Sequence, residues 1–377
     1  MDQWKDCKKI LCIRPDNMGD LIMSTPAIHA LKEKFGCSIT LLTSYMAAGI
    51  VPFIKDVDAV ILYNAPWVKT NMESDPDELY AIIERIKEQD FDAAVIFTVF
   101  SQTPLVSAMI PFLAGIPKRL AYCRENPYSL LTHWIPDKEP YSFVRHQVQR
   151  DLELVRAIGA DTQDQHLRLR LGKTVLPEVE RKLTAIGVDW DKPWLLMHAG
   201  VSDPKRLYPQ KYWIETGKQI INELGYQVIL TGNSFERSDV EVLKNKIGGQ
   251  AFNAAGLLSL EEFITIIKHA ELVVSVNTST IHIAAATDTP MVVLYALTNP
   301  QHLPWKARGK ALLYDIPEYL RSNNQVLQFV HEYLHPKNIP LVMPADILEA
   351  VRDLITSNGA DPIPDMVPLQ AVPEQIH

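Results

Sequence analysis

The chain has 377 residues, of which 47% are hydrophobic and 22% are charged, and its formal net charge is −8. This length allows two domains with separate cores, and the acidic balance excludes a general nucleic-acid binder. No apolar run approaches the roughly 20 residues of a membrane span, and the N-terminus lacks an apolar secretion segment. The four cysteines form no CxxC pair and no histidine cluster completes a zinc site. We therefore expect reduced thiols, no metal and a cytoplasmic protein.

The first predicted elements form a strand, a loop and a helix. A short apolar strand is predicted at residues 10–13, and a polar loop follows it. Ser24 or Thr25 is expected to cap the next helix, which leaves Asp20 in the loop. Units of this kind bind their ligands in the loop after the strand. Asp20 is therefore interpreted either as a catalytic carboxylate or as an ordinary capping residue.

The first half alternates strands with helices, which predicts a doubly wound parallel sheet. Residues 104–117 are apolar and are interpreted as a buried helix, with a surface that contacts a membrane or an apolar acceptor as the alternative. From residue 118 to 151 basic side chains exceed acidic ones, which predicts a solvated face or a contact with an anionic acceptor. The other elements predicted here are at residues 39–42, 59–63, 77–88, 91–100 and 146–158.

A polar segment without periodicity, residues 161–174, is the predicted interdomain linker. The alternation then restarts, which predicts a second open α/β sheet, and two such domains are expected to enclose a central cleft. The predicted domains are residues 1–165, 176–335 and a C-terminal helix with a mobile tail at 336–377. The elements of the second half are predicted at residues 194–198, 212–224, 227–230, 235–247, 260–269, 272–276, 277–286, 291–295 and 346–356.

One loop of the second half has the composition of an anion-binding site. Thr278 and Ser279 stand at a predicted helix start, and His282 follows one turn later. The free backbone N–H groups and the dipole of such a helix end favour phosphate. The alternatives are hydroxyls that cap only the backbone and a histidine with a structural role.

Two further loops should open on the same edge of that sheet. Lys205 and Arg206 follow one strand, and Glu236 follows the next. A cation, a helix N-terminus and a carboxylate on one edge suit the diphosphate and ribose of a nucleotide. Taken separately, the basic pair could be solvated surface, and Glu236 could simply stabilise its own helix N-terminus.

Four short motifs follow one another in a defined order and spacing: Arg14-x4-Gly19-Asp20, Lys205-Arg206-x2-Pro209, Thr231-Gly232 with Glu236, and Asn277-Thr278-x3-His282. Together they resemble the glycosyltransferase family 9 heptosyltransferases, from about Ile10 to about Trp305. The resemblance implies a GT-B fold with two Rossmann-like domains and no cofactor. It also implies an inverting, metal-independent transfer of a sugar, typically from ADP-heptose, to a lipopolysaccharide core or related glycolipid acceptor. Such a protein would work in the cytoplasm, with at most a peripheral contact to the inner membrane.

The resemblance also implies roles for single residues. Asp20 matches the general base, which takes the proton of the acceptor hydroxyl, and Lys205 matches the lysine that neutralises the leaving diphosphate. The sequence departs from the family pattern in several places: Asn277 replaces the usual Asp, Ser279 the usual Gly, and Gly200 and Val201 a frequent Ser or Thr. The segment from Lys205 to Pro209 also has one residue more than the usual spacing. The residues that match donor-binding positions are Gly19, Arg206, Glu236, Leu258, Asn277, Thr278, Ser279 and His282.

Three other functions remain open at this point. A nucleotide-sugar epimerase would share the fold and need no acceptor, and a non-catalytic relative would bind a nucleotide sugar or a partner protein without turnover. A dehydrogenase is disfavoured because the first strand-loop-helix lacks the G-x-G-x-x-G pattern.

Overall fold

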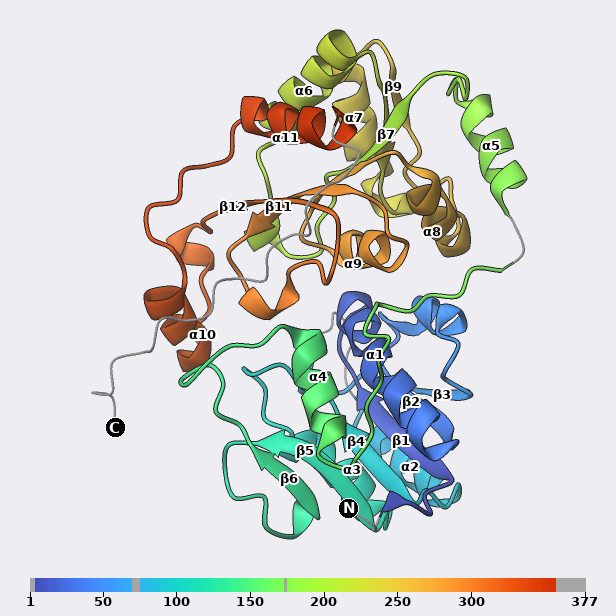
Figure 1. Cartoon of the computed structure of the whole chain (residues 1–377), viewed down its shortest axis with the longest axis vertical. Helices are drawn as coiled ribbons and strands as arrows, with labels where there is room; N and C mark the ends of the chain where they lie inside the picture. Colours follow the sequence, from blue (N-terminus) through green and yellow to red (C-terminus); the bar gives the residue numbers. More distant parts are fainter. Residues whose placement is uncertain (1–3, 70–74, 173–174, 357–377) are drawn as a thin grey trace. The chain divides into compact units, whose positions relative to one another are not determined.

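The computed structural model of the protein describes residues 4–69, 75–172 and 175–356. The chain forms two compact units, whose boundary lies between Arg170 and Leu171. The N-terminal unit runs from blue to green in Figure 1, and the C-terminal unit from green to red. The predicted mobile tail lies outside the described residues.

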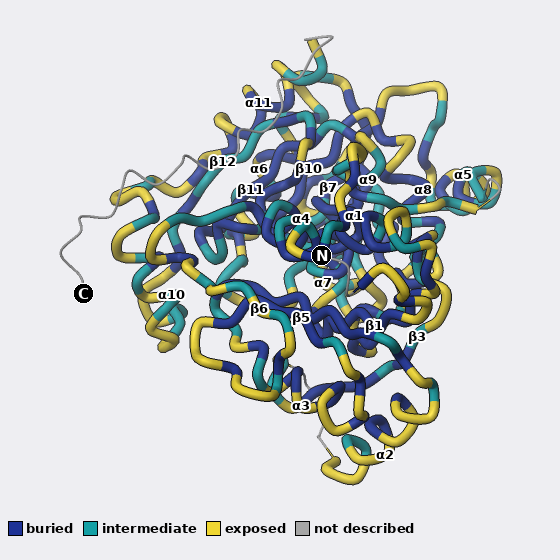
Figure 2. Tube along the Cα trace, turned by 60° about the horizontal axis from the view of Figure 1, so that its bottom comes forward, coloured by how far each residue is buried: buried dark blue, intermediate teal, exposed yellow. Residues whose placement is uncertain are grey.

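The N-terminal unit contains six parallel strands in the order β3-β2-β1-β4-β5-β6. The inner strands β1 and β4 are buried along almost their whole length, as expected for strands covered on both faces. Figure 2 shows this contrast between buried strands and the more exposed helix α2. The strands are β1 Lys9–Arg14, β2 Ser38–Thr43, β3 Ala59–Leu62, β4 Ala93–Ile96, β5 Lys118–Cys123 and β6 His133–Pro136, and the α-helices are α1 Met18–Phe35, α2 Pro76–Lys87, α3 Leu105–Leu113 and α4 Gln147–Arg156.

The sequence did not predict strands β5 and β6. β5 begins with Lys118 and Arg119, which is atypical of an inner strand. The Arg119 guanidinium is nevertheless buried, because it donates hydrogen bonds to backbone carbonyls of Ser129 and Leu130 at 2.7 and 2.8 Å. β6 is the edge strand and is only partly covered, so it lacks an apolar pattern.

The C-terminal unit contains a second parallel sheet, in the order β12-β11-β10-β7-β8-β9. The predicted helix 212–224 begins two residues earlier, is α-helical to Gln219 and continues as a π-helix over Ile220–Leu224. The sequence did not predict β9, β12, α5 or α10. The strands are β7 Trp194–His198, β8 Gln227–Thr231, β9 Ala251–Asn253, β10 Val273–Val276, β11 Met291–Ala296 and β12 Gly309–Tyr314, and the α-helices are α5 Leu176–Ala185, α6 Gln210–Gln219, α7 Arg237–Ile247, α8 Leu260–His269, α9 Ser279–Ala286, α10 Gln325–Phe329 and α11 Pro344–Thr356.

Both sheets have the same strand order when each is counted from its own first strand. In the first sheet, β2 and β3 lie on one side of β1, and β4 to β6 lie on the other. In the second, β8 and β9 lie on one side of β7, and β10 to β12 on the other. The order reverses between β1 and β4 and between β7 and β10. Ligands of open α/β sheets bind at the carboxyl ends of the strands at such reversal points.

Helix α3 only partly agrees with the buried helix expected at residues 104–117. One side of it is buried through Ala108 and Ile110. The other side exposes four apolar side chains, each 38–47% accessible: Val106, Met109, Phe112 and Leu113. Among the described residues, no helix is both long and apolar enough to cross a membrane.

Candidate active site

In the N-terminal unit, a buried guanidinium lies at the carboxyl end of β1. Arg14 is inaccessible to solvent, and its Nε lies 3.3 Å from Oδ2 of Asp16. Its Nη2 donates a 3.3 Å hydrogen bond to Oδ1 of Asp20. Burial acts to lower the pKa of Arg14, but the surrounding carboxylates of Asp16, Asp151 and Asp20 outweigh it and raise that pKa. Arg14 therefore stays charged and orients the Asp20 carboxylate.

The start of α1 differs from the prediction. The helix begins at Met18 rather than after Ser24 or Thr25, so Asp20 and Gly19 lie in its first turn and not in a loop. The prediction was wrong because a cap at Ser24 or Thr25 puts Pro26 in the first turn of the helix, where proline is common, whereas Pro26 lies inside α1. Inside the helix, the proline cannot donate a hydrogen bond to the carbonyl of Ile22. The Thr25 hydroxyl donates to that carbonyl instead, at 2.7 Å, so the helix passes through the proline.

Besides Asp16 and Asp20, a third carboxylate lies near Arg14, and the sequence did not identify it. It belongs to Asp151 of α4. Asp151 accepts hydrogen bonds of 2.7 Å from Oγ of Ser24 and from Nε2 of Gln147. Burial raises the pKa of Asp151 to about 6, although Arg14 and both hydrogen bonds act to lower it. Only the packing of α4 on α1 brings Asp151 here, because the residues are more than a hundred positions apart in the chain.

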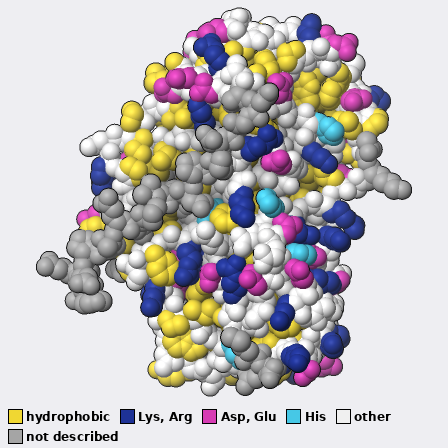
Figure 3. All heavy atoms as spheres, viewed as in Figure 1, with side chains coloured by type: hydrophobic (Ala, Val, Ile, Leu, Met, Phe, Trp, Pro, Cys, Tyr) yellow, Lys and Arg dark blue, Asp and Glu magenta, His cyan; other side chains and the backbone are white. Residues whose placement is uncertain are grey.

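Of the basic residues in segment 118–151, Arg119 and Arg150 are buried, whereas Arg124 and Lys138 are exposed. Arg150 is buried, stacks on Tyr122, and donates 2.8 Å hydrogen bonds to the carboxylates of Asp137 and Glu139. Arg124 donates to backbone carbonyls, among them that of Phe100. On the face drawn in Figure 3, basic and acidic side chains are interspersed rather than collected in one positive area.

In the C-terminal unit, the loops after β7 and β10 meet. Nη1 of Arg206 donates a 3.0 Å hydrogen bond to the backbone carbonyl of Asn277. This bond brings the Lys205–Arg206 pair to the N-terminal end of α9. Two buried polar atoms there have no hydrogen-bond partner in the described structure, namely Nε of Arg206 and Oγ1 of Thr278. A bound anion can accept hydrogen bonds from both.

The neighbouring side chains have partners of their own. Nζ of Lys205 lies 3.7 Å from the carboxylate of Asp203, and both remain partly exposed. Ser279 is the first residue of α9, and Thr278 is its N-cap, although its side chain forms no cap hydrogen bond. His282 is buried on the same helix.

Asn277 is an internal link between two strand ends. Its Nδ2 donates to the Ala296 carbonyl and to the Thr298 hydroxyl, both at 3.2 Å. Its Oδ1 accepts the backbone N–H of Ala296, also at 3.2 Å. An aspartate has the acceptor but lacks the N–H donors. The amide that departs from the family pattern is therefore the group that joins the β10 and β11 loops in this chain.

Glu236 lies at the end of β8 and is held by its own turn. Its Oε2 accepts the backbone N–H of Asn233 at 2.7 Å, while Oδ1 of Asn233 accepts the Glu236 N–H at 3.1 Å. The helix-stabilising alternative from the sequence is thus present, as a reciprocal cap. Leu258 is partly buried in the segment between β9 and α8.

His198, the last residue of β7, was assigned no role from the sequence. Its Nδ1 lies 3.0 Å from the Thr231 hydroxyl, and its ring packs on Phe263. Burial lowers the pKa of His198 to about 4, so the imidazole is neutral at pH 7. It fixes the ends of β7 and β8 without adding positive charge.

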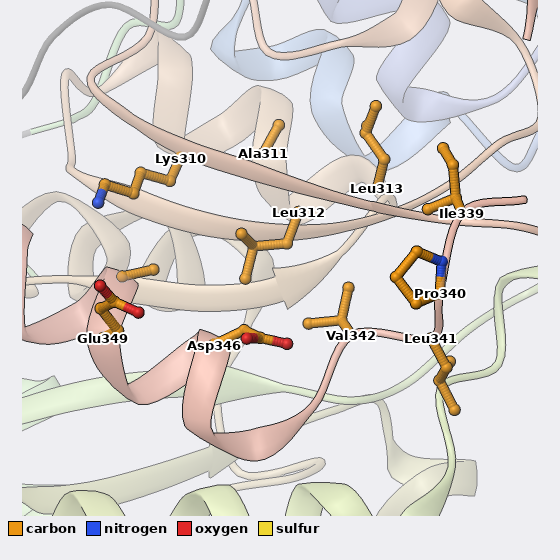
Figure 4. A pocket seen from close by; sticks show the side chains of 11 residues that line it. Lys310, Ala311, Leu312, Leu313, Ile339, Pro340, Leu341, Val342, Asp346 and Glu349 are labelled. Carbon is orange, nitrogen blue, oxygen red and sulfur yellow. The ribbon is translucent and has the colours of Figure 1, made fainter. Parts of the chain in front are cut away.

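The candidate site residues do not line the two grooves described next. A groove of about 390 Å³ lies between edge strand β12 and the segment 339–342, with Asp346 and Glu349 of α11 beside it (Figure 4). Another, of about 610 Å³, is lined by residues of β5, β6 and α4. In the described part of the chain, no group of three or more His, Cys, Asp or Glu side chains could hold a metal ion.

Comparison with known proteins agrees with this arrangement. Residues 79–326 match the family described as glycosyltransferase family 9 (heptosyltransferase). Lipopolysaccharide heptosyltransferase 2 of Salmonella typhimurium is 24% identical over 363 residues, which cover 93% of this chain and 99% of that protein. A family 9 glycosyltransferase structure from Veillonella parvula has a TM-score of 0.73 at 15% identity and covers 93% of this chain and 98% of that one. The structure of E. coli ADP-heptose LPS heptosyltransferase II has a TM-score of 0.65 at 21% identity, covering 92% and 98%. The chain therefore has the GT-B fold and is a glycosyltransferase that belongs to family 9.

Proposed function

We propose that this protein is an inverting, metal-independent transferase that moves a heptose-like sugar from an ADP-heptose-like donor to a lipopolysaccharide core or related glycolipid. The observation that carries the proposal is the pair of buried donors without acceptors, Arg206 Nε and Thr278 Oγ1, at the N-terminal end of α9. Its geometry suits a diphosphate. The names of the relatives, which include an ADP-heptose enzyme, support the choice of sugar and acceptor.

In this proposal the protein supplies one base and one cationic site. The acceptor oxygen forms a bond to the anomeric carbon while the bond from that carbon to the phosphate oxygen breaks. Asp20 takes the acceptor proton, and the electron pair of the broken bond leaves with the diphosphate. Lys205, Arg206 and the N-terminal end of α9 stabilise the growing negative charge, the work that a divalent metal does in other transferases.

The nucleoside would lie toward β8 and β9. Glu236 offers carboxylate oxygens for ribose hydroxyls, and Leu258 offers an apolar contact for the base. Ser279 and His282 would face the phosphates and sugar, while Gly19 keeps the start of α1 free of a side chain beside Asp20. Asn277 supports this site through the backbone that it joins.

Helix α3 suggests where the protein touches the membrane that carries such an acceptor. Its exposed apolar side chains occupy one side of the helix, and no charged residue occurs from Phe97 to Pro117. We infer that this face rests on the lipid surface while the protein works in the cytoplasm. Met109→Glu combined with Phe112→Glu should abolish co-sedimentation with vesicles, whereas Val242→Glu, an exposed apolar site on α7, should not. Equal sedimentation of all variants contradicts this contact.

The proposed function is tested by calorimetry with ADP, UDP, GDP and CMP in EDTA, followed by assays with the matching nucleotide sugars. Selective ADP binding and transfer from ADP-heptose to a lipopolysaccharide core acceptor support it. Binding at 100 times the dissociation constant also raises the unfolding free energy by about 2.7 kcal/mol, which thermal unfolding detects. Isomerisation of the donor without acceptor, a need for metal, or preference for another nucleotide contradicts it.

A further inference from the structure

Gly200, two residues beyond β7, lies against the Glu236 carboxyl group. A Cβ atom built on Gly200 would come within 2.8 Å of the Glu236 carboxyl carbon and of both its oxygens. Real Cβ atoms do not approach other atoms so closely, so a side chain at position 200 and the present position of Glu236 exclude one another. The carboxylate therefore fills the space that a side chain would take.

The backbone does not require a glycine here. Gly200 is not among the glycines with positive φ, unlike Gly225 or Gly256, so another residue could adopt its conformation. Gly200 is thus needed for space and not for a turn. In this chain the space of the missing side chain is filled by a carboxylate from the neighbouring strand end.

A second glycine completes this arrangement. A Cβ on Gly232, just after β8, would lie 3.0 Å from Oε2 of Glu236. That oxygen already accepts the Asn233 N–H at 2.7 Å. Oε1 faces Gly200, so it is the oxygen available to a ligand at the end of β7. A carboxylate accepts hydrogen bonds and repels phosphate, so the group that it selects is a hydroxyl.

We propose that Gly200 determines donor specificity, because its missing side chain lets Glu236 read the ribose hydroxyls of the nucleotide at the end of β7. This inference rests on the proposed function, of which it deepens the donor site. A side chain at position 200 displaces the carboxylate and removes the hydroxyl recognition. The diphosphate is excluded from this corner and directed to the N-terminal end of α9.

The test is a double-mutant cycle with Gly200→Ala, Glu236→Ala and the combined variant, measured by calorimetry with ADP and 2′-deoxy-ADP. The wild type should bind ADP about ten- to a hundredfold more tightly than 2′-deoxy-ADP, the range of a hydrogen bond to a charged group. Gly200→Ala should lose most of this preference. Adding Gly200→Ala to Glu236→Ala should change ADP affinity by less than about twofold, because the carboxylate is already gone. Thermal unfolding of each variant verifies that it is folded.

The outcomes distinguish a failure of the proposed function from a failure of the inference about Gly200. Failure of the wild type to bind ADP overturns the proposed function and this inference with it. Binding of ADP with no preference over 2′-deoxy-ADP overturns the inference alone. So does a Gly200→Ala variant that keeps the preference, or one whose loss is equally large with and without Glu236.

Discussion

The two sheets have the same strand order but carry opposite chemistry at their reversal points. At the end of β1, three carboxylates surround the guanidinium of Arg14. Near the ends of β7 and β10, two basic side chains, hydroxyls and a helix N-terminus gather with few acceptors. The fold thus determines where a ligand can bind, and the loops determine which charge it can have.

Among the described residues, both regions leave buried polar atoms without hydrogen-bond partners, but the atoms are of different kinds. In the N-terminal unit, Ser24, Gln147 and Gln102 donate hydrogen bonds to the buried carboxylates. In the C-terminal unit, Arg206 Nε and Thr278 Oγ1 are left without acceptors in the described structure. Within the described chain, the first region leaves both donors and acceptors unpaired, among them Arg14 Nη1 and Gln147 Oε1, whereas the second leaves Arg206 Nε and Thr278 Oγ1, whose hydrogens suit an anion.

The largest effect is expected for Asp20→Asn, which keeps the size of the side chain and removes the base. The rate of transfer should fall by about 10²- to 10⁴-fold, the contribution of a general base. Donor affinity, which depends on the other sheet, should stay unchanged. Steady-state kinetics with calorimetry for the same donor measure both. Transfer at the wild-type rate would show that another group takes the proton.

Asp151→Asn should change the pH dependence of stability. The native pKa of Asp151 is about 6, raised by burial from 3.8, so the folded state holds this proton more tightly than the unfolded state. This contribution to stability is complete below about pH 4 and is lost as the pH rises to about 6, and it amounts to about 3 kcal/mol. Asp151→Asn should not show this loss of unfolding free energy with rising pH.

Chemical unfolding at a series of pH values from 4 to 7 measures this difference. Asp239→Asn, at an exposed position on α7, is the matched control. Its unfolding free energy should change with pH as that of the wild type does. If the unfolding free energies of the wild type and Asp151→Asn change with pH in the same way, the carboxylate of Asp151 is not buried in solution as it is in the structure.

Lys205→Ala should weaken the cationic region without disturbing the fold. Loss of a charged contact to the diphosphate costs about 1.5–3 kcal/mol, which corresponds to a 10- to 150-fold decrease in kcat/KM. Lys211→Ala removes an exposed lysine that stacks on Tyr212 and should leave kcat/KM unchanged. Equal kcat/KM values for the two variants would show that Lys205 does not contribute to the transfer.

Asn277→Asp introduces the residue that the resemblance to family 9 implies at this position, and it should lower the stability of this chain. The variant loses the N–H donors to the Ala296 carbonyl, and an unsatisfied buried acceptor costs about 1–3 kcal/mol. Asn324→Asp is the control, because Asn324 uses only its side-chain oxygen to cap α10. A thermal midpoint unchanged in both variants would mean that the link between the β10 and β11 loops contributes no stability.

The sequence by itself determined the alternating α/β architecture of both units and the loops after β7, β8 and β10 that carry the C-terminal part of the candidate site. These depend on local patterns: apolar runs of strand length, helical spacing and glycines such as Gly36, which ends α1 with a positive φ. Only the tertiary structure decided that α1 starts before Asp20, that β5 is a strand despite Lys118 and Arg119, and that Asp151 faces Ser24.

The contact between Gly200 and Glu236 belongs to this second group. Each residue is visible in the sequence, but the space that one leaves for the other exists only where β7 pairs with β8. Parallel strands bring together segments that are distant in the chain, so contacts between their ends do not follow from the periodicity of either segment. Local patterns determine which elements form, and the pairing of those elements determines which side chains meet.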